Sequence, residues 1–330
     1  MRDKLIFVLK LAISATLIAF IFSQVDLGML RAKLASANVA YLLLATVLYF
    51  SAIVVNCAKW AVLLRAQVTG VPFRMLLRYT FIGVFFNTML PANIGGDVVR
   101  GYELSAYTDS KLDAAASVIV DRLVGLLAFI TSAVVAATIL VSATHRPDME
   151  VIAVAAVTAL VALAFTMALL FSRRLRARVA LAFGWSFLKP LAPIYGRLAD
   201  AFGAYRFRYK TLALAFAIGM GGLMLTNLVN YAISEALGGG MPLLMIALFN
   251  PIIALVLLIP ISVGGIGVNQ NAYVFFYGLA GVPYNHALAV SLVMQALILL
   301  SGLPGAVLWL RTQRGRPASA ATSLGDVKSS

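Results

Sequence analysis

Long apolar runs, separated by short polar connections, dominate the sequence. Most of the runs reach the roughly 20 consecutive apolar residues that one helical crossing of a bilayer needs. They therefore predict membrane-spanning helices rather than the core of a water-soluble domain. The predicted spans are 5–23, 40–58, 114–143, 151–172, 211–234, 242–259 and 286–310.

Two further apolar segments, 79–94 and 261–283, are interrupted in the middle. Segment 79–94 is short and is followed by charged sequence, so we interpret it as a re-entrant loop. Segment 261–283 is longer and either crosses the membrane as a broken helix or re-enters. The predicted fold class is an all-α integral membrane protein with about eight transmembrane helices and a re-entrant or broken-helix pair.

Both interruptions share one layout. Leu90–Gly96 and Ile259–Gly265 each contain an apolar residue, a proline, two variable residues, a second apolar residue and a glycine pair. Proline removes a backbone donor from a helix, and a broken helix persists at membrane depth only where protein or a water-filled cavity satisfies its free backbone groups. Matched interruptions in the two halves of a chain indicate a transport site, and they suggest an inverted internal pseudo-repeat.

Basic residues outnumber acidic residues by 26 to 12, and they gather in three stretches, Lys59–Arg78, 173–210 and 311–328. By the positive-inside rule these stretches lie in the cytoplasm, which places both termini there in a multi-pass protein of the inner cell membrane. Trp60 and Trp309 stand beside basic ends, where interfacial aromatic anchors are common. The expected partners of the basic stretches are anionic lipid headgroups rather than nucleic acid.

The domain organisation that follows is simple. Residues 1–311 form one polytopic membrane domain, and residues 312–330, rich in Ser, Ala and Gly, form a disordered cytoplasmic tail. The first apolar run is interpreted as an uncleaved helix, because Phe22-Ser23-Gln24 is a poor signal-peptide cleavage site. The connection 173–210 is too short for an ordinary catalytic domain.

The amino-acid composition limits the kinds of protein and of binding site that the chain can form. Charged residues make up 12% of the chain, against about 25% in a typical soluble domain. The single cysteine, Cys57, and the two histidines, His145 and His286, favour neither a disulfide nor a metal site. The sequence also lacks the phosphate-binding loop of an ATP-driven transporter. We therefore expect no cofactor and no metal.

Three blocks of sequence, in order, resemble the lysylphosphatidylglycerol synthase transmembrane-region family, a group of flippase-like membrane proteins. The blocks are Asn87–Arg100, Ala114–Leu123 with its acid–arginine pair, and Pro260–Val268. The third block departs from the family pattern, because Asn269 and Gln270 stand where a basic residue and a glutamate usually follow.

The resemblance implies movement of a lipid between bilayer leaflets. The best-known members also carry a cytoplasmic domain that transfers lysine to phosphatidylglycerol, and the resemblance does not extend to that domain. We therefore expect a protein that moves a lipid and does not synthesise it.

The ionisable residues in the first two blocks have competing interpretations. Asp97 is either an ordinary helix N-cap or part of a polar site. Arg100 lies on the same helix face and either pairs with Asp97 or holds a lipid phosphate. Asp121 and Arg122 are either an interfacial charge pair or the lateral mouth of a headgroup path. The candidate substrate-binding residues are Asn87, Pro91, Asn93, Gly95, Gly96, Asp97, Arg100, Asp121, Arg122, Pro260, Ser262, Gly264, Gly265, Gly267 and Gln270.

Two groups of small or polar residues also have a purely structural interpretation. The glycines of the breaks either cradle an anionic headgroup or permit close helix crossing. The polar residues inside spans favour interhelical hydrogen bonding over substrate contact. These polar residues are Asn227, Asn230, Ser234 and Gln295.

Three functions remain open from the sequence. The leading hypothesis is a lipid translocase, in which Asp97, Arg100 and the two breaks form one polar cavity. The second is an integral-membrane transferase acting on a lipid carrier, with Asp97 or Asp121 as base. The third is a non-transporting partner that recruits a separate lipid-modifying enzyme through the loop 173–210.

Overall fold

The structure, a computed structural model, describes residues 27–65, 71–89, 95–107, 111–144, parts of 151–165, 205, 207–257 and 265–315. Within these ranges every regular element is a helix. The main elements are α2 (Leu27–Ala35), α3 (Val39–Leu64), α4 (Phe73–Met89), α5 (Gly95–Leu104), the short 3₁₀ turn η1 (Ser105–Tyr107), α6 (Lys111–Thr144), α10 (Tyr209–Ala236), α11 (Leu243–Val256), α12 (Val268–Leu279) and α13 (Tyr284–Gly315).

Four of these helices, α3, α6, α10 and α13, are long and apolar enough to cross a membrane. They confirm the spans predicted at 40–58, 114–143, 211–234 and 286–310. Helix α11 has 14 residues and contains Pro251, so it is shorter than the span predicted at 242–259. The predicted span 5–23 lies outside the described residues. The total of about eight crossings stays a prediction.

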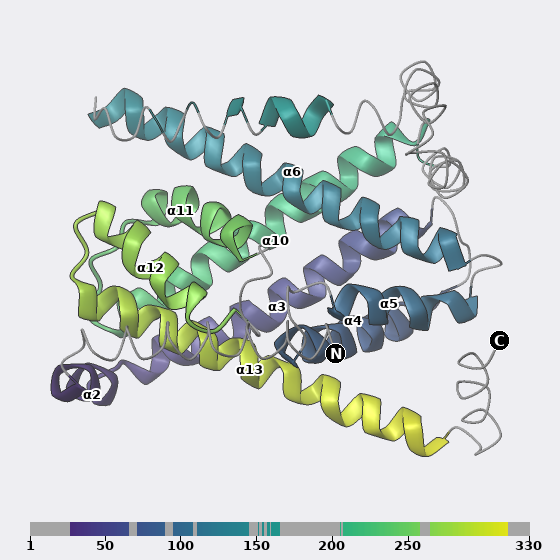
Figure 1. The fold of residues 1–330 in the computed structure, drawn as a ribbon, viewed down its shortest axis with the longest axis horizontal. Helices are drawn as coiled ribbons and strands as arrows, with labels where there is room; N and C mark the ends of the chain where they lie inside the picture. The colour runs from purple at the N-terminus through teal and green to yellow at the C-terminus, as the bar shows by residue number, and fades with distance from the viewer. Residues whose placement is uncertain are drawn as a thin grey trace, which may run out of the picture.

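The central pair of the bundle is α3 and α10, which pack along each other (Figure 1). Helices α6 and α13 lie on opposite sides of this pair in the same view. Helices α10 to α13 share a buried apolar core that includes Ile233, Phe249 and Tyr277. The outer faces stay apolar too, as on α13, where Leu299 and Leu303 are exposed. This surface suits a lipid environment.

Glycines set the spacing of α4 against its two neighbours. A Cβ atom placed on Gly96 of α5 would overlap the carbonyl group of Gly83 on α4. A Cβ atom on Gly305 of α13 would likewise overlap the Phe81 carbonyl group of α4. Small residues permit such approach in membrane bundles. Gly96 therefore has a packing role, which was one of the two roles considered for the glycines of the breaks.

We expect Gly96→Ala and Gly305→Ala each to destabilise the protein by about 1–3 kcal/mol, because an added methyl group must push two helix backbones apart. The measurement is thermal unfolding of the purified protein in detergent. Gly221→Ala is the matched control, because a Cβ at this position in α10 meets nothing within 4 Å. Unfolding of Gly96→Ala at the wild-type temperature would show that α4 and α5 are not held in close contact.

Candidate functional site

Five charged side chains meet where α3, α5 and α6 pack together, and we refer to them as the charge cluster. Lys59 Nζ lies 3.2 Å from Asp121 Oδ1. Arg100 Nη2 lies 3.1 Å from Asp121 Oδ2 and 3.1 Å from Asp97 Oδ1. Arg122 Nε donates to Asp97 Oδ2. Each carboxylate is therefore held by two cations, and Arg100 joins the two carboxylates.

The charge cluster is shielded from solvent at one end and open at the other. Lys59 is 5% exposed and Asp121 is 4% exposed, whereas the Arg122 side chain is 42% exposed. With three cations and two carboxylates, the charge cluster carries one excess positive charge. Such pairing is the usual condition under which ionised groups persist inside an apolar bundle.

Lys59 and Trp60 are not where the sequence analysis placed them. We expected Lys59 in a solvent-exposed basic connection and Trp60 at the membrane interface, and both residues are buried. The Trp60 ring lies 4.7 Å from the Arg100 guanidinium carbon, and its Nε1 donates to Ser117 Oγ at 3.4 Å. The prediction was wrong because α3 continues to Leu64, more than a turn beyond the predicted end of the span.

The charge cluster also decides between the alternative roles of its members. Asp97 is the third residue of α5, so it is not the N-cap of that helix. It does pair with Arg100, as their spacing predicted. Asp121 binds Lys59 and Arg100, and Arg122 binds Asp97.

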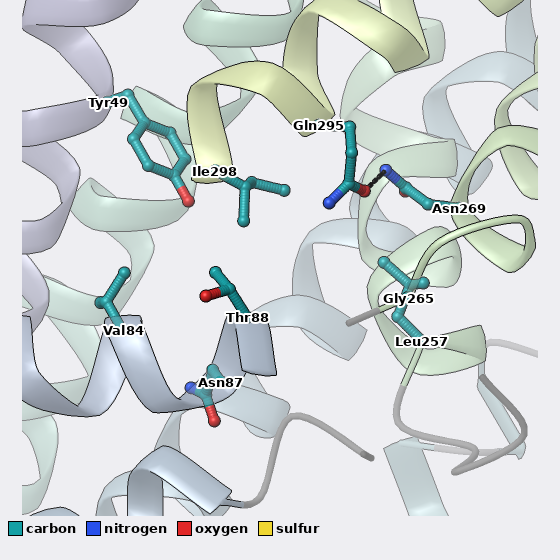
Figure 2. A pocket seen from close by; sticks show the side chains of 9 residues that line it. All are labelled: Tyr49, Val84, Asn87, Thr88, Leu257, Gly265, Asn269, Gln295 and Ile298. Carbon is teal, nitrogen blue, oxygen red and sulfur yellow. Dashed lines mark hydrogen bonds between the residues drawn. The ribbon is translucent and has the colours of Figure 1, made fainter. Parts of the chain in front are cut away.

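A pocket of about 220 Å³ lies between the end of α4 and the described residues that flank the second break (Figure 2). Asn87 and Thr88 belong to the last turn of α4, just before the first break. Leu257 and Gly265 stand on either side of the second break. Described residues that flank both interruptions therefore border one pocket. The described lining residues are Tyr49, Val84, Asn87, Thr88, Leu257, Gly265, Asn269, Gln295 and Ile298.

The polar groups of the pocket are amides and hydroxyls. Asn269 Nδ2 donates to Gln295 Oε1 at 3.3 Å, and the Gln295 amide nitrogen points toward the middle of the pocket (Figure 2). The Tyr49 hydroxyl group also points inward, from α3. None of the described lining residues is charged. Asp97 and Arg100 are not among the described lining residues, and the single cavity lined by both breaks that the sequence suggested stays a prediction.

The pocket and the charge cluster are connected through Asn87. Its Oδ1 atom accepts a hydrogen bond of 2.8 Å from the backbone N–H of Gly96, in the first turn of α5. This turn carries Asp97, which is a member of the charge cluster. A movement of α5 would therefore displace Asp97 in the charge cluster and strain the hydrogen bond to Asn87 at the pocket.

The second break begins α12 with two glycines in the left-handed backbone region, Gly265 at φ 74° and Gly267 at φ 86°. Gln270 Oε1 accepts a 2.7 Å hydrogen bond from the Gly267 N–H. Gln270 thus stabilises the start of α12, and its neighbour Asn269 lines the pocket instead. Sequence reasoning named Gln270 and missed Asn269, because the side on which each side chain falls depends on where the helix begins.

Six sequence-predicted site residues remain, and five of them lie outside the part of the chain that the structure describes. Pro91, Asn93, Pro260, Ser262 and Gly264 lie outside the described residues, so their roles stay predictions. Gly95 is the first residue of α5. Tyr49 and Thr88 also line the pocket, and neither was a predicted site residue, although Thr88 stands in the first sequence block.

Polar residues inside α10 bind neighbouring helices, as the sequence indicated. Asn227 Oδ1 accepts from Asn250 Nδ2 of α11 at 2.9 Å. Asn230 Oδ1 accepts from the Tyr273 hydroxyl of α12 at 2.6 Å. Ser234 Oγ lies 3.0 Å from His286 Nε2 of α13. Gln295 binds Asn269 in the same manner but also faces the pocket. Among the described residues, no group of three or more His, Cys, Asp or Glu side chains could hold a metal ion.

We expect Asp121→Asn to destabilise the protein by about 3–5 kcal/mol, because it removes a partner of two buried cations. The double variant Lys59→Gln with Asp121→Asn keeps the excess charge of the cluster unchanged and should recover a large part of that loss. The measurement is a double-mutant cycle by thermal unfolding in detergent. Additive effects of the two substitutions would contradict the pairing.

Residues 7–305 match the family model described as the lysylphosphatidylglycerol synthase TM region. The match includes all three sequence blocks and every residue of the charge cluster and the pocket. The chain is also 26% identical, over 288 residues, to a protein named UPF0104 membrane protein from Methanothermobacter thermautotrophicus (strain Delta H). That alignment covers 82% of this chain and 84% of the relative.

Proposed function

Because the chain belongs to the lysylphosphatidylglycerol synthase transmembrane-region family of membrane proteins, we propose that it moves a polar lipid between the two leaflets of a bilayer. The observation that carries this proposal is the pocket bordered by described residues that flank both helix breaks. Paired interruptions that meet at one polar site are characteristic of proteins that carry a substrate across a membrane.

The pocket supplies the hydrogen-bond partners that a polar headgroup lacks in the hydrocarbon part of a bilayer. Moving a polar group into hydrocarbon without hydrogen-bond partners costs roughly 2–7 kcal/mol for each group. The amides of Asn87, Asn269 and Gln295 and the Thr88 hydroxyl offer replacement partners along the path. The headgroup crosses through these contacts.

The acyl chains remain in lipid during the crossing. Helix α13 has the two faces that this requires, with Gln295 and Ile298 on the pocket and Leu299 and Leu303 exposed on the apolar surface. A lipid that straddles α13 would keep its headgroup on the first face and its chains against the second.

The charge cluster contributes positioning in this proposal. Its excess positive charge favours an anionic group, and Arg122, 42% exposed at its side chain, is the member that a lipid phosphate can reach. Asp97 and Asp121 are each bonded to two cations and do not line the pocket, so neither is placed to act as the base of a transferase.

We expect wild-type protein in liposomes to equilibrate a headgroup-labelled lipid between leaflets, so that an impermeant quencher reaches more than the outer half of the label. The double variant Asn269→Leu with Gln295→Leu should slow this at least about 10-fold, because it removes hydrogen-bond partners from the path. Both members of a bonded pair are replaced together, so no buried polar group is left unpaired and folding is preserved.

The matched control is Asn227→Leu with Asn250→Leu, which removes an equally buried amide pair between α10 and α11 that does not line the pocket. It should translocate lipid at the wild-type rate once thermal unfolding confirms that it is folded. Wild-type protein that moves no lipid faster than empty liposomes would refute the proposed function.

A further inference from the structure

We propose that the pocket accepts an uncharged, hydroxyl-bearing headgroup, such as a glycerol or a sugar, and excludes a headgroup with an ammonium group. This inference rests on the proposed function and specifies its substrate class. It follows from three properties of the pocket, namely the charge of its lining, the position of the nearest carboxylates and the kind of hydrogen-bonding groups it presents.

The first property is the neutral lining. The described residues around the pocket contribute amides, hydroxyls and aliphatic groups and no carboxylate. An ammonium group removed from water is stabilised most strongly by an anion or by the face of an aromatic ring. Tyr49 is the one aromatic residue among the described lining residues, and it directs its hydroxyl group, not its ring face, toward the middle of the pocket (Figure 2).

The second property is the engagement of the nearby acids. Asp97 and Asp121 are the carboxylates of the charge cluster, and each already binds two cations. Redirecting either one toward the pocket would leave buried cations without a partner, which costs several kcal/mol. An ammonium group in the pocket would therefore have no counter-ion among the residues that the structure describes.

The third property is the mixture of donors and acceptors. Gln295 Oε1 is occupied by Asn269 Nδ2, so the Gln295 amide directs its nitrogen, a donor, toward the pocket. Thr88 Oγ1 donates to the Phe85 carbonyl group at 2.7 Å, which leaves its oxygen lone pairs as acceptors. A hydroxyl group both donates and accepts, so it complements both kinds of partner. An ammonium group only donates.

The size of the pocket agrees with a small headgroup. Its volume of about 220 Å³ equals the liquid volume of about seven water molecules. That space holds a few hydroxyl groups and no acyl chain. The phosphate of a phospholipid would then remain outside the pocket, on the side of the charge cluster.

The test compares four lipids with identical acyl chains in wild-type proteoliposomes. Phosphatidylglycerol and phosphatidylserine share a net charge of about −1, and a hexosyl diacylglycerol and phosphatidylethanolamine share a net charge of about zero at pH 7. One member of each pair has hydroxyl groups and no ammonium group. We expect that member to translocate at least about 10-fold faster, which is the discrimination that one or two hydrogen bonds supply. The faster of the two hydroxyl lipids identifies glycerol or sugar as the preferred group.

Equal rates within each pair, or a ranking that follows net charge, would overturn the inference while leaving the translocase proposal intact. Movement of none of the four lipids would refute the translocase proposal instead. Binding of the same four lipids to the detergent-purified protein, measured by native mass spectrometry, then decides the inference separately. A preference for the hydroxyl lipids supports it, and equal binding refutes it.

Gln295→Glu provides a second, independent readout, because it places a carboxylate in the pocket. It should raise the share of phosphatidylethanolamine that binds and lower the share of the hexosyl lipid. Asn250→Asp is the matched control, since Asn250 is 8% exposed and Gln295 is 7% exposed, but Asn250 does not line the pocket. If both variants shift the bound shares of the two lipids equally, the added negative charge changes lipid binding from outside the pocket, and this result would contradict the inference.

Discussion

The chain of ion pairs from Lys59 to Arg122 is the interaction on which the rest of the site depends. Ionised side chains in an apolar bundle persist only when they are paired, so the contacts that satisfy Asp121 also fix α6 against α3 and α5. Arg100 connects the two carboxylates of this chain of ion pairs, because it bonds to both of them, and its guanidinium group lies over the Trp60 ring. The ion pairs therefore hold α5 in place, and the first turn of α5 binds Asn87, which lines the pocket.

The two walls of the pocket are held by different chemistry. On the α4 side, the close approach of Gly83 and Gly96 and the hydrogen bond from Gly96 to Asn87 connect the pocket to the charge cluster. On the other side, the Asn269–Gln295 hydrogen bond joins α12 to α13 at the pocket. The charge cluster lies on the α5 side of the connection through Asn87, its carboxylates are each paired with two cations, and none of its members is among the described lining residues of the pocket. The described lining of the pocket combines aliphatic groups with amides and hydroxyls and carries no charge, and this is the property from which we infer the class of headgroup.

Several features of this arrangement were predictable from the sequence. The matched layout of Leu90–Gly96 and Ile259–Gly265 predicted that two distant segments serve one site, and their described ends do border the same pocket. The spacing of Asp97 and Arg100 predicted their pairing. Polar residues within apolar runs, such as Asn227 and Asn230, predicted interhelical hydrogen bonds. Each of these predictions rests on local spacing or on the cost of an unpaired polar group in lipid.

The sequence by itself thus determined the all-helical membrane class and four of the spans, because hydropathy acts over short stretches of chain. Only the tertiary structure decided which charges meet. Lys59 reaches Asp121, 62 residues away, since α3 continues past its predicted end and buries Lys59 and Trp60. Only the tertiary structure, too, placed Asn269 on the pocket and Gln270 at the helix start. Partners of buried charges are chosen by helix packing, and no local pattern records that choice.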